Sequence, residues 1–490
     1  MPTLPGGAQA DPHVEVSQGL LRGTELGETG GAFLGVPFAA APMGERRWRY
    51  PAPQEPWEGT RDAVAFAPAC MQGSYMTDWY ADVIGDFGGE PETAAKPVSE
   101  SEDCLYLNVW SPDLQPDTPL PVMVWIHGGG YSGGWTYEPN YIGDALSERG
   151  VIVVSIAYRL GPFGYLGPDS TGNFGLMDQV MALEWVQENI GSFGGDANNV
   201  TLFGESAGAA SIGTLIVTPK AAGLFQKAIH QSGGFEFIEA STHRDIRPAF
   251  EILTAALAPL DPATVSASDL LETSQSVLSD HWFTPVADGA LLPDRPDNLL
   301  ARREVNAVDL MIGTNSDEWL MSLDMSNLEE QIANWGDRAP GATEMISALV
   351  QEAGIAGALD RLETAHQMRC PGARLAAAMN AAGKQVYMYR FSRVRASEMG
   401  ARIGSYHGAE IPYVFNTHDD WLPTDAVDTK LTDLMMQAWV EFARSGDPAR
   451  SLDWPEYGSS GSLIELGDQI TVSKPLDRAL CDHLGRIEAE

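Results

Sequence analysis

The sequence has few basic residues for its length, and this shortage restricts the partners it can bind. Its 490 residues include 30 Lys and Arg against 67 Asp and Glu, which gives a formal net charge of −37. So large a negative charge repels nucleic acid and anionic membrane surfaces. The plain interpretation is a heavily solvated acidic surface, and we expect no nucleic-acid partner.

Several other features are missing as well. No apolar run reaches the length of about 20 residues that a membrane span needs, so no span is expected. Residues 1–7 contain no basic region followed by an apolar stretch, and therefore do not resemble a signal peptide. No segment repeats, which excludes solenoids and propellers. No nucleotide loop, haem motif or zinc spacing occurs, so we expect neither cofactor nor metal. The sequence carries no signal for oligomeric state.

What the sequence does contain is an alternation of short apolar runs with helical stretches. Residues 121–126, 151–156 and 200–203 predict buried strands, and residues 177–190 carry apolar side chains at helical spacing. Further stretches of the two kinds follow, with helices expected at 374–382 and 431–444 and a strand at 385–391. Such alternation predicts an α/β fold, with a large, mostly parallel sheet covered by helices on both faces. Because no low-complexity linker divides the chain, residues 1–490 are expected to form a single domain.

The short pattern Gly-x-Ser-x-Gly occurs twice, around Ser206 and around Ser132. A nucleophilic serine of this kind needs a strand, a tight turn and then a helix whose N-terminus faces the reacting oxygen. Ser206 follows the strand 200–203 and precedes small residues that let a helix pack close to a sheet. Ser132 follows its strand by six residues, and residues 135–139 cannot open a helix cleanly. Ser206 is therefore the predicted nucleophile.

A run of three glycines, 128–130, lies just beyond the end of the strand 121–126. Glycines let backbone N–H groups point into a cavity without side chains in the way. An acyl-transfer intermediate carries a negative oxygen that needs such donors, which hydrolases take from this loop and from the residue after the nucleophile. We therefore expect an oxyanion hole made by Gly129, Gly130 and Ala207. A plain glycine turn is the alternative interpretation of the run.

Four longer runs extend these motifs, at 101–110, 158–164, 175–179 and 193–208. They resemble the signatures of the type-B carboxylesterase/lipase family, which includes cholinesterases and bacterial para-nitrobenzyl esterases. The resemblance covers nearly the whole chain. It implies an α/β-hydrolase fold in which loop and helical insertions form an active-site gorge. It also implies a serine esterase that acts on small-molecule esters.

The resemblance also indicates an acid and a base. Residues 312–318 are similar to the family segment that carries the acid, which corresponds to Glu318, and residues 406–415 to the segment that carries His407. Imidazole can take the serine proton, and the carboxylate fixes its tautomer and stabilises the imidazolium. The family usually has glycine after the acid, whereas this chain has Trp319. Asp317 therefore stays open as an alternative acid.

Three more residues lie in these motifs without a predicted role in bond breaking. His127 belongs to the glycine-loop motif, where we expect a structural hydrogen bond. His230 is expected to pack behind the nucleophile turn. Ser232 resembles a family serine that supports the catalytic acid.

The four cysteines resemble two disulfide pairs of the family, Cys70 with Cys104 and Cys370 with Cys481. Two matched pairs with no cysteine left over indicate oxidising surroundings. We therefore expect a secreted or periplasmic enzyme whose signal peptide has been removed. The alternative is a cytoplasmic protein with four reduced, buried thiols.

The substrate side is weakly encoded. From the resemblance we expect Trp79, Tyr131, His281 and Phe283 to contact the substrate. His281 stands where cholinesterases place bulky aromatics that restrict the acyl group, so a small-acyl preference is not expected. Trp79 lies in the loop that carries the choline-binding tryptophan of cholinesterases, but at a different distance from Cys104. Choline esters are therefore not predicted.

One basic segment stands out in this acidic chain. Between 384 and 407, Lys384 and four arginines oppose only Glu398. These cations either pair with surface acids or form a basic rim that accepts esters carrying carboxylates.

The predicted activity is hydrolysis of carboxylic esters through an acyl-enzyme. The same triad acting on carbamates, amides or thioesters is one alternative. A non-catalytic binding protein is another, although family members of that kind lose the serine, which is present here.

Overall fold

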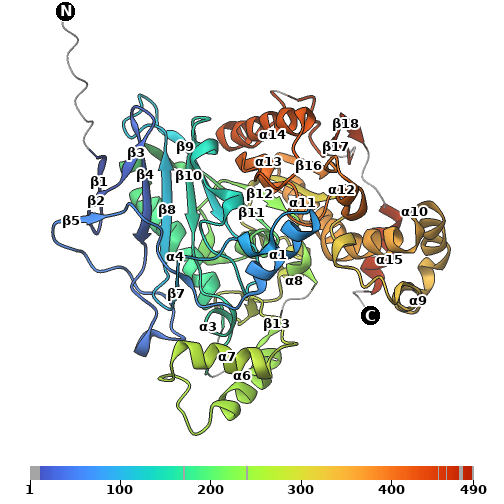
Figure 1. Cartoon of the computed structure of the whole chain (residues 1–490), viewed down its shortest axis with the longest axis horizontal. Helices are drawn as coiled ribbons and strands as arrows, with labels where there is room; N and C mark the ends of the chain where they lie inside the picture. Colours follow the sequence, from blue (N-terminus) through green and yellow to red (C-terminus); the bar gives the residue numbers. More distant parts are fainter. Residues whose placement is uncertain are drawn as a thin grey trace, which may run out of the picture.

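The computed structural model describes residues 11–168, 172–238, 241–450, 452–458, 461–473 and 478–487. A large sheet forms its centre (Figure 1). The strands of this sheet are β3 (Thr24–Leu26), β4 (Gly30–Pro37), β8 (Tyr106–Ser111), β9 (Leu120–Ile126), β10 (Ile152–Ile156), β11 (Gly195–Glu205), β12 (Lys227–Gln231), β15 (Asp309–Asn315), β16 (Val386–Phe391), β17 (Leu463–Leu466) and β18 (Ile470–Ser473). They are arranged in the order β18-β17-β16-β15-β12-β11-β9-β10-β8-β4-β3.

The middle of this sheet is parallel and its two ends are antiparallel. Neighbouring strands run parallel from β10 through β9, β11, β12, β15 and β16 to β17. Strands β8, β4 and β3 continue it antiparallel at one end, and β18 at the other. Parallel strands need long crossovers, and these carry the helices. The mostly parallel sheet expected from the sequence is confirmed.

Helices cover both faces of the sheet, because successive strand side chains point to opposite sides. In β9, Val122 and Val124 pack in one apolar core, whereas Met123 and Trp125 pack in another. The first core also contains α4 (Phe174–Asn189), α5 (Ala207–Ile216) and α11 (Cys370–Ala381). The second contains α2 (Asp144–Ser147), α13 (Ile411–Phe415) and α14 (Ala426–Ser445). The sheet is therefore the middle of three layers.

The remaining elements lie around these layers. Three small sheets are formed by β1 (His13–Val16), β2 (Gly19–Arg22) and β5 (Thr60–Asp62); by β6 (Ala69–Cys70) and β7 (Glu100–Ser101); and by β13 (Ser241–Thr242) and β14 (Val286–Ala287). The other helices are α1 (Tyr75–Asp86), α3 (Gly161–Tyr165), α6 (His243–Leu257), α7 (Ala267–Val277), α8 (Pro296–Ala301), α9 (Leu328–Arg338), α10 (Thr343–Thr364), α12 (Glu398–Ile403) and α15 (Arg478–Ile487). Helices α9, α10 and α15 share a separate apolar cluster, which lies at one side of the molecule (Figure 1).

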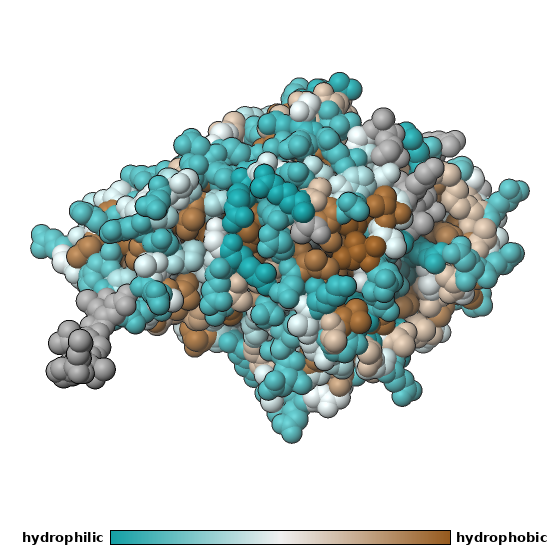
Figure 2. Space-filling view, turned by 90° about the horizontal axis from the view of Figure 1, so that it is seen from above, coloured by the Kyte–Doolittle hydropathy of each residue, from teal (hydrophilic) through white to brown (hydrophobic). Residues whose placement is uncertain are grey.

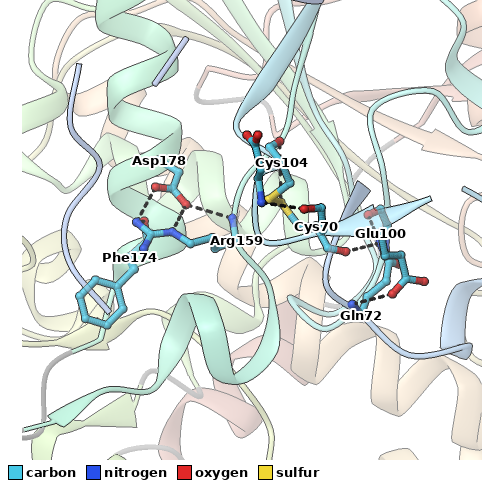
Figure 3. Close-up of a disulfide and its surroundings, with 10 residues drawn as sticks. Cys70, Gln72, Glu100, Cys104, Arg159, Phe174 and Asp178 are labelled. Atoms are coloured by element: carbon cyan, nitrogen blue, oxygen red, sulfur yellow. Dashed lines mark hydrogen bonds and ion pairs between the residues drawn. A yellow bond between two sulfur atoms is a disulfide. The ribbon is translucent and has the colours of Figure 1, made fainter. Parts of the chain in front are cut away.

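Both expected disulfides are present. Cys70 at the end of β6 is bonded to Cys104, and α1 lies in the loop that this bond closes. Cys370 at the start of α11 is bonded to Cys481 in α15. Figure 3 shows the first disulfide beside Gln72, whose backbone N–H donates to a Glu100 carboxylate oxygen at 3.3 Å.

The elements expected from the sequence appear with shifts of a few residues at their ends. The expected strand 121–126 is β9, and the expected helix 177–190 is α4. Among the described residues, no helix combines the length and apolarity that crossing a bilayer requires. Hydrophilic residues cover most of the face shown in Figure 2, in agreement with the solvated surface expected from the sequence.

Candidate active site

Ser206 lies on a sharp turn between β11 and α5. Its backbone has φ 55° and ψ −124°, a conformation that a residue with a Cβ rarely adopts and that costs about 1–3 kcal/mol. Two hydrogen bonds hold it there. The Ser206 N–H donates to the Gln231 carbonyl at 2.9 Å, and its own carbonyl accepts from the Ala210 N–H at 2.9 Å. The strand, turn and helix predicted around this serine are all present.

The two glycines of the motif are needed because the turn passes directly against the end of β9. A Cβ on Gly208 would lie 1.9 Å from the Ile126 carbonyl oxygen, and one on Gly204 would lie 2.6 Å from it. Ser132 has a different setting. Its N–H donates to the Gly129 carbonyl within a turn of the loop after β9, and no helix begins at the next residue. The context therefore separates the two copies of the pattern as expected.

The three residues expected to supply the oxyanion hole are two glycines at the cavity of Ser206 and the residue that follows this serine. Gly129 and Gly130 have φ values of 94° and 58° and line the same cavity as Ser206. A Cβ on Gly129 would lie 2.3 Å from the Gly133 carbonyl oxygen, so this position requires glycine. Ala207 is the first residue of α5, where helix N–H groups have no partner within the helix. Within the described part of the chain, the N–H groups of Gly129, Gly130 and Ala207 donate to no protein acceptor.

Glu318 and His407 form a close pair. Glu318 follows the end of β15, and its Oε2 lies 2.7 Å from His407 Nδ1. Its Oε1 accepts from the Ser232 hydroxyl at 2.6 Å and from the Asn315 N–H at 2.7 Å. The Glu318 side chain is 1% exposed. Three partners therefore fix this carboxylate, and it in turn orients the imidazole.

Asp317, the alternative acid, lies elsewhere. Its Oδ2 accepts from the Ser405 N–H at 2.9 Å, and none of its contacts among the described residues is with His407. It therefore helps to hold the loop that carries the histidine, while the neighbouring carboxylate contacts the ring.

The other ring nitrogen of His407 faces Glu205. The distance from Nε2 to Glu205 Oε1 is 3.2 Å. No hydrogen bond among the described residues joins Ser206 Oγ to the imidazole, although both side chains line one cavity. Burial lowers the pKa of His407, but the Glu205 and Glu318 carboxylates outweigh it and raise this pKa above that of free histidine. Burial raises the pKa of Glu205. The two carboxylates therefore favour the protonated form of the ring.

The cavity that Ser206 and His407 share has a volume of about 370 Å³. Aromatic residues form a large part of its wall, and they are Tyr75, Trp79, Tyr80, Trp125, Tyr141, Phe235, Trp282 and Trp319. The charged lining residues in the described structure are Glu138 and Glu205, with no lysine or arginine. No group of His, Cys, Asp and Glu among the described residues is placed to hold a metal. An aromatic cavity of this size suits an apolar organic group.

Trp79 lines the cavity, but three of the four expected substrate contacts do not. Tyr131 is 1% exposed and packs edge-on against Tyr165, with ring centroids 5.0 Å apart. His281 and Phe283 pack edge-on against each other at 4.9 Å. The residue between these two, Trp282, is the one that lines the cavity, and it is 57% exposed. Tyr131, His281 and Phe283 thus lie away from the cavity wall, and Trp282 takes the place expected for its two neighbours.

The structure favours the first interpretation of the basic segment, pairing with surface acids, over a basic rim. Arg390 pairs with Glu465 at 2.6 Å, and Arg393 pairs with Asp428 at 2.7 Å. Arg402 pairs with Asp86 at 2.9 Å, and Arg395 contacts the His418 ring at 3.0 Å. None of these arginines lines the cavity. Pairing with the many acids explains the basic segment.

The remaining motif residues have structural contacts of the expected kind. His127 Nδ1 lies 2.9 Å from the Gly128 carbonyl, and its ring stacks on Tyr158. Burial lowers the pKa of His127 to about 4. His230 is fully buried behind the turn, with its Nε2 at 2.9 Å from Glu236 Oε1.

Sequence reasoning missed Glu205 and Glu410 as members of the site. Glu410 accepts from the Gln231 side chain at 3.0 Å and from the Asn315 side chain at 2.7 Å, and burial raises its pKa. Glu205 stands inside the Gly-x-Ser-x-Gly pattern itself, and Glu410 lies three residues after His407. Acidic residues this close to the motif residues were the available signal.

Comparison with known proteins agrees with this architecture. The sequence model of the carboxylesterase family matches residues 10–483. A fumonisin B1 esterase of Sphingopyxis macrogoltabida is 32% identical over 92% of this chain and 87% of its own length. A para-nitrobenzyl esterase of Bacillus subtilis is 35% identical over 89% of this chain and 91% of its own length.

Solved structures give the same result. A PNB esterase structure superposes with a TM-score of 0.83 at 30% identity, covering 97% of this chain and 99% of the other. The carboxylesterase EST55 of Geobacillus stearothermophilus gives a TM-score of 0.81 at 31% identity, with coverage of 97% and 99%. These neighbours have the α/β-hydrolase fold. The chain therefore belongs to the carboxylesterase family and is a carboxylic ester hydrolase.

Proposed function

We propose that this enzyme hydrolyses carboxylic esters through an acyl-enzyme on Ser206, with His407 as the base and Glu318 as the acid of the triad. The observation that carries the proposal is the 2.7 Å contact between Glu318 and His407 at the cavity that holds the strained serine. A buried carboxylate on one ring nitrogen leaves the other available to take a proton from a hydroxyl. This is the arrangement that activates a serine.

In the first half of the reaction, Ser206 Oγ attacks the ester carbonyl carbon while His407 takes the hydroxyl proton. The carbonyl oxygen becomes an oxyanion, and the N–H groups of Gly129, Gly130 and Ala207 hold it. His407 then gives its proton to the leaving alcohol as the carbon–oxygen bond breaks. In the second half, water attacks the acyl-enzyme, His407 takes the water proton, and the proton returns to Ser206 Oγ as the acid leaves.

The cavity wall supports apolar or aromatic esters as substrates. Aromatic residues form a large part of its lining, and its acidic members are Glu138 and Glu205. Neither a lysine nor an arginine lines the cavity in the described structure to pair with a carboxylate on the substrate. We therefore no longer propose such esters.

We also propose that the enzyme works in an oxidising compartment, either secreted or periplasmic. All four cysteines are paired, in two disulfides. Such bonds persist outside the reducing cytoplasm.

The catalytic proposal is tested by comparing Ser206→Ala with Ser132→Ala, the serine of the second pattern. We expect Ser206→Ala to lower kcat/KM for a simple aryl ester by about 10⁴–10⁶-fold and Ser132→Ala to change it by less than about 3-fold. Comparable losses in the two variants would reject the proposal.

A further inference from the structure

Trp319 directly follows Glu318, at the position where the family resembled by this sequence usually has glycine. Its ring stacks on the imidazole of His407, with the planes 10° apart and the centroids 6.0 Å apart. The same side chain lines the cavity. Trp319 is half-buried, and its indole ring is far larger than the hydrogen atom of a glycine, so the wall beside the histidine differs greatly from one formed at a glycine.

The backbone of Trp319 is fixed, while its ring is held by packing. The backbone N–H donates to Asp360 Oδ1 at 2.8 Å, and Asp360 is a buried residue of α10. Among the described residues, the indole nitrogen has no hydrogen-bond partner. Stacking on His407 therefore orients the ring. A phenylalanine in its place would lose no hydrogen bond, which makes it a conservative replacement.

A second tryptophan, Trp79, lies close to Gly408, the residue that follows His407. A Cβ built on Gly408 would lie 3.9 Å from the Trp79 ring, and Trp79 lines the same cavity. The corner formed by His407 and Gly408 is thus flanked by two indole rings. One of them comes from the loop closed by Cys70 and Cys104, and the other comes from the turn after β15.

The proposed reaction places the alcohol group of the ester, not its acyl group, beside His407 and Gly408. His407 gives its proton to the leaving alcohol oxygen, so the alcohol group must lie beside the imidazole when the ester bond breaks. Trp319 covers one face of that imidazole. Side chains there contact the alcohol group more directly than the acyl group.

We propose that Trp319 is a specificity-determining residue, which with Trp79 forms a narrow slot that selects esters of flat, aromatic alcohols. The inference rests on the proposed function, because it assigns the alcohol to the His407 side. A planar ring gains stacking contacts with an indole. A puckered ring of similar size lacks this contact and needs a wider space.

The test compares benzyl butyrate with cyclohexylmethyl butyrate, which share an acyl group and differ in the flatness of the alcohol. The parent, Trp319→Phe, Trp319→Leu and Trp319→Gly are measured, with active sites counted by stoichiometric organophosphate labelling. We expect the parent to prefer the benzyl ester about 10-fold in kcat/KM. Trp319→Phe should keep this preference, whereas Trp319→Leu and Trp319→Gly should reduce it to about 3-fold or less.

A merely structural role would lower kcat/KM for both esters equally, so the ratio separates the two roles. An unchanged ratio in Trp319→Leu, a variant that keeps an apolar side chain but loses the flat aromatic ring, would overturn the proposal. A parent preference for the cyclohexylmethyl ester would overturn it as well. Failure of the proposed function has a different signature, because Ser206 in the parent would then take up no label.

Discussion

The reaction centre and the wall of the cavity above it are built from different kinds of segment. Ser206 directly follows the end of strand β11, and Glu318 lies just beyond the end of strand β15, where three partners fix its carboxylate. Trp79 and Trp282 stand outside the sheet, on α1 and on a loop. In the proposed function, the ends of the sheet strands hold the nucleophile and the acid, whereas segments outside the sheet line the cavity that receives the substrate. Changes in the two regions should therefore affect different kinetic constants.

The largest effect should come from the acid of the reaction centre. Glu318→Gln keeps the shape but removes the charge that stabilises the imidazolium, and we expect kcat to fall by about 10³–10⁴-fold. Asp317→Asn is the matched control, because an amide oxygen can still accept from the Ser405 N–H. We expect that variant to stay within about 3-fold in steady-state kinetics. A larger loss at Asp317 than at Glu318 would reverse the assignment.

The next largest effect should come from removing each of the two disulfides, of which the bond between Cys70 and Cys104 closes a loop that contributes Trp79 to the cavity wall. Cys70→Ser with Cys104→Ser should lower the free energy of unfolding by about 2–5 kcal/mol, measured by urea denaturation. It should also raise KM, because α1 and Trp79 lie in the loop that this bond closes. Cys370→Ser with Cys481→Ser should destabilise by a similar amount and leave KM within about 2-fold. Equal KM changes in the two double variants would show that the wall does not depend on its own disulfide.

A smaller effect is expected at the wall itself. Trp79→Ala removes a cavity-lining ring beside Gly408, and KM for aromatic esters should rise by about 10-fold while kcat changes by less than about 3-fold. Trp282→Ala is the comparison, because this ring is 57% exposed and should matter less. A fall in kcat at Trp79 as large as that at Glu318 would erase the distinction between the two regions.

The smallest expected effect is a shift in the pH dependence of kcat/KM. A carboxylate beside His407 stabilises the imidazolium and raises the pKa of the ring, yet the ring must be neutral to accept the serine proton. Glu205→Gln removes one such carboxylate, so the pKa of His407 should fall. The acid limb of the kcat/KM profile should then move to lower pH by about one unit. An unmoved limb would show that Glu205 does not control this proton.

The residues of the proposed reaction centre could be predicted from the sequence because each of them stands in a long, recognisable run. The turn at Ser206 needs glycine on both sides, and that requirement is visible as a five-residue pattern. Likewise Glu318 and His407 lie in recognisable segments. The strands behind them, such as β9, were predictable because both of their faces are apolar.

The wall could not be predicted in the same way. Which of His281, Trp282 and Phe283 faces the cavity depends on the path of a loop, which no periodicity encodes. The partners of Arg390 and Arg393 are Glu465 and Asp428, which the fold brings near from distant parts of the chain. The basic segment therefore looked unpaired in the sequence.

The central claim is that Ser206 carries the acyl group, and covalent trapping tests it most directly. The enzyme is treated with an organophosphate, digested with a protease and mapped by mass spectrometry. We expect one phosphoryl adduct per chain, on the peptide that contains Ser206, and none in Ser206→Ala. An adduct on the Ser132 peptide, or one of equal yield in Ser206→Ala, would contradict the account.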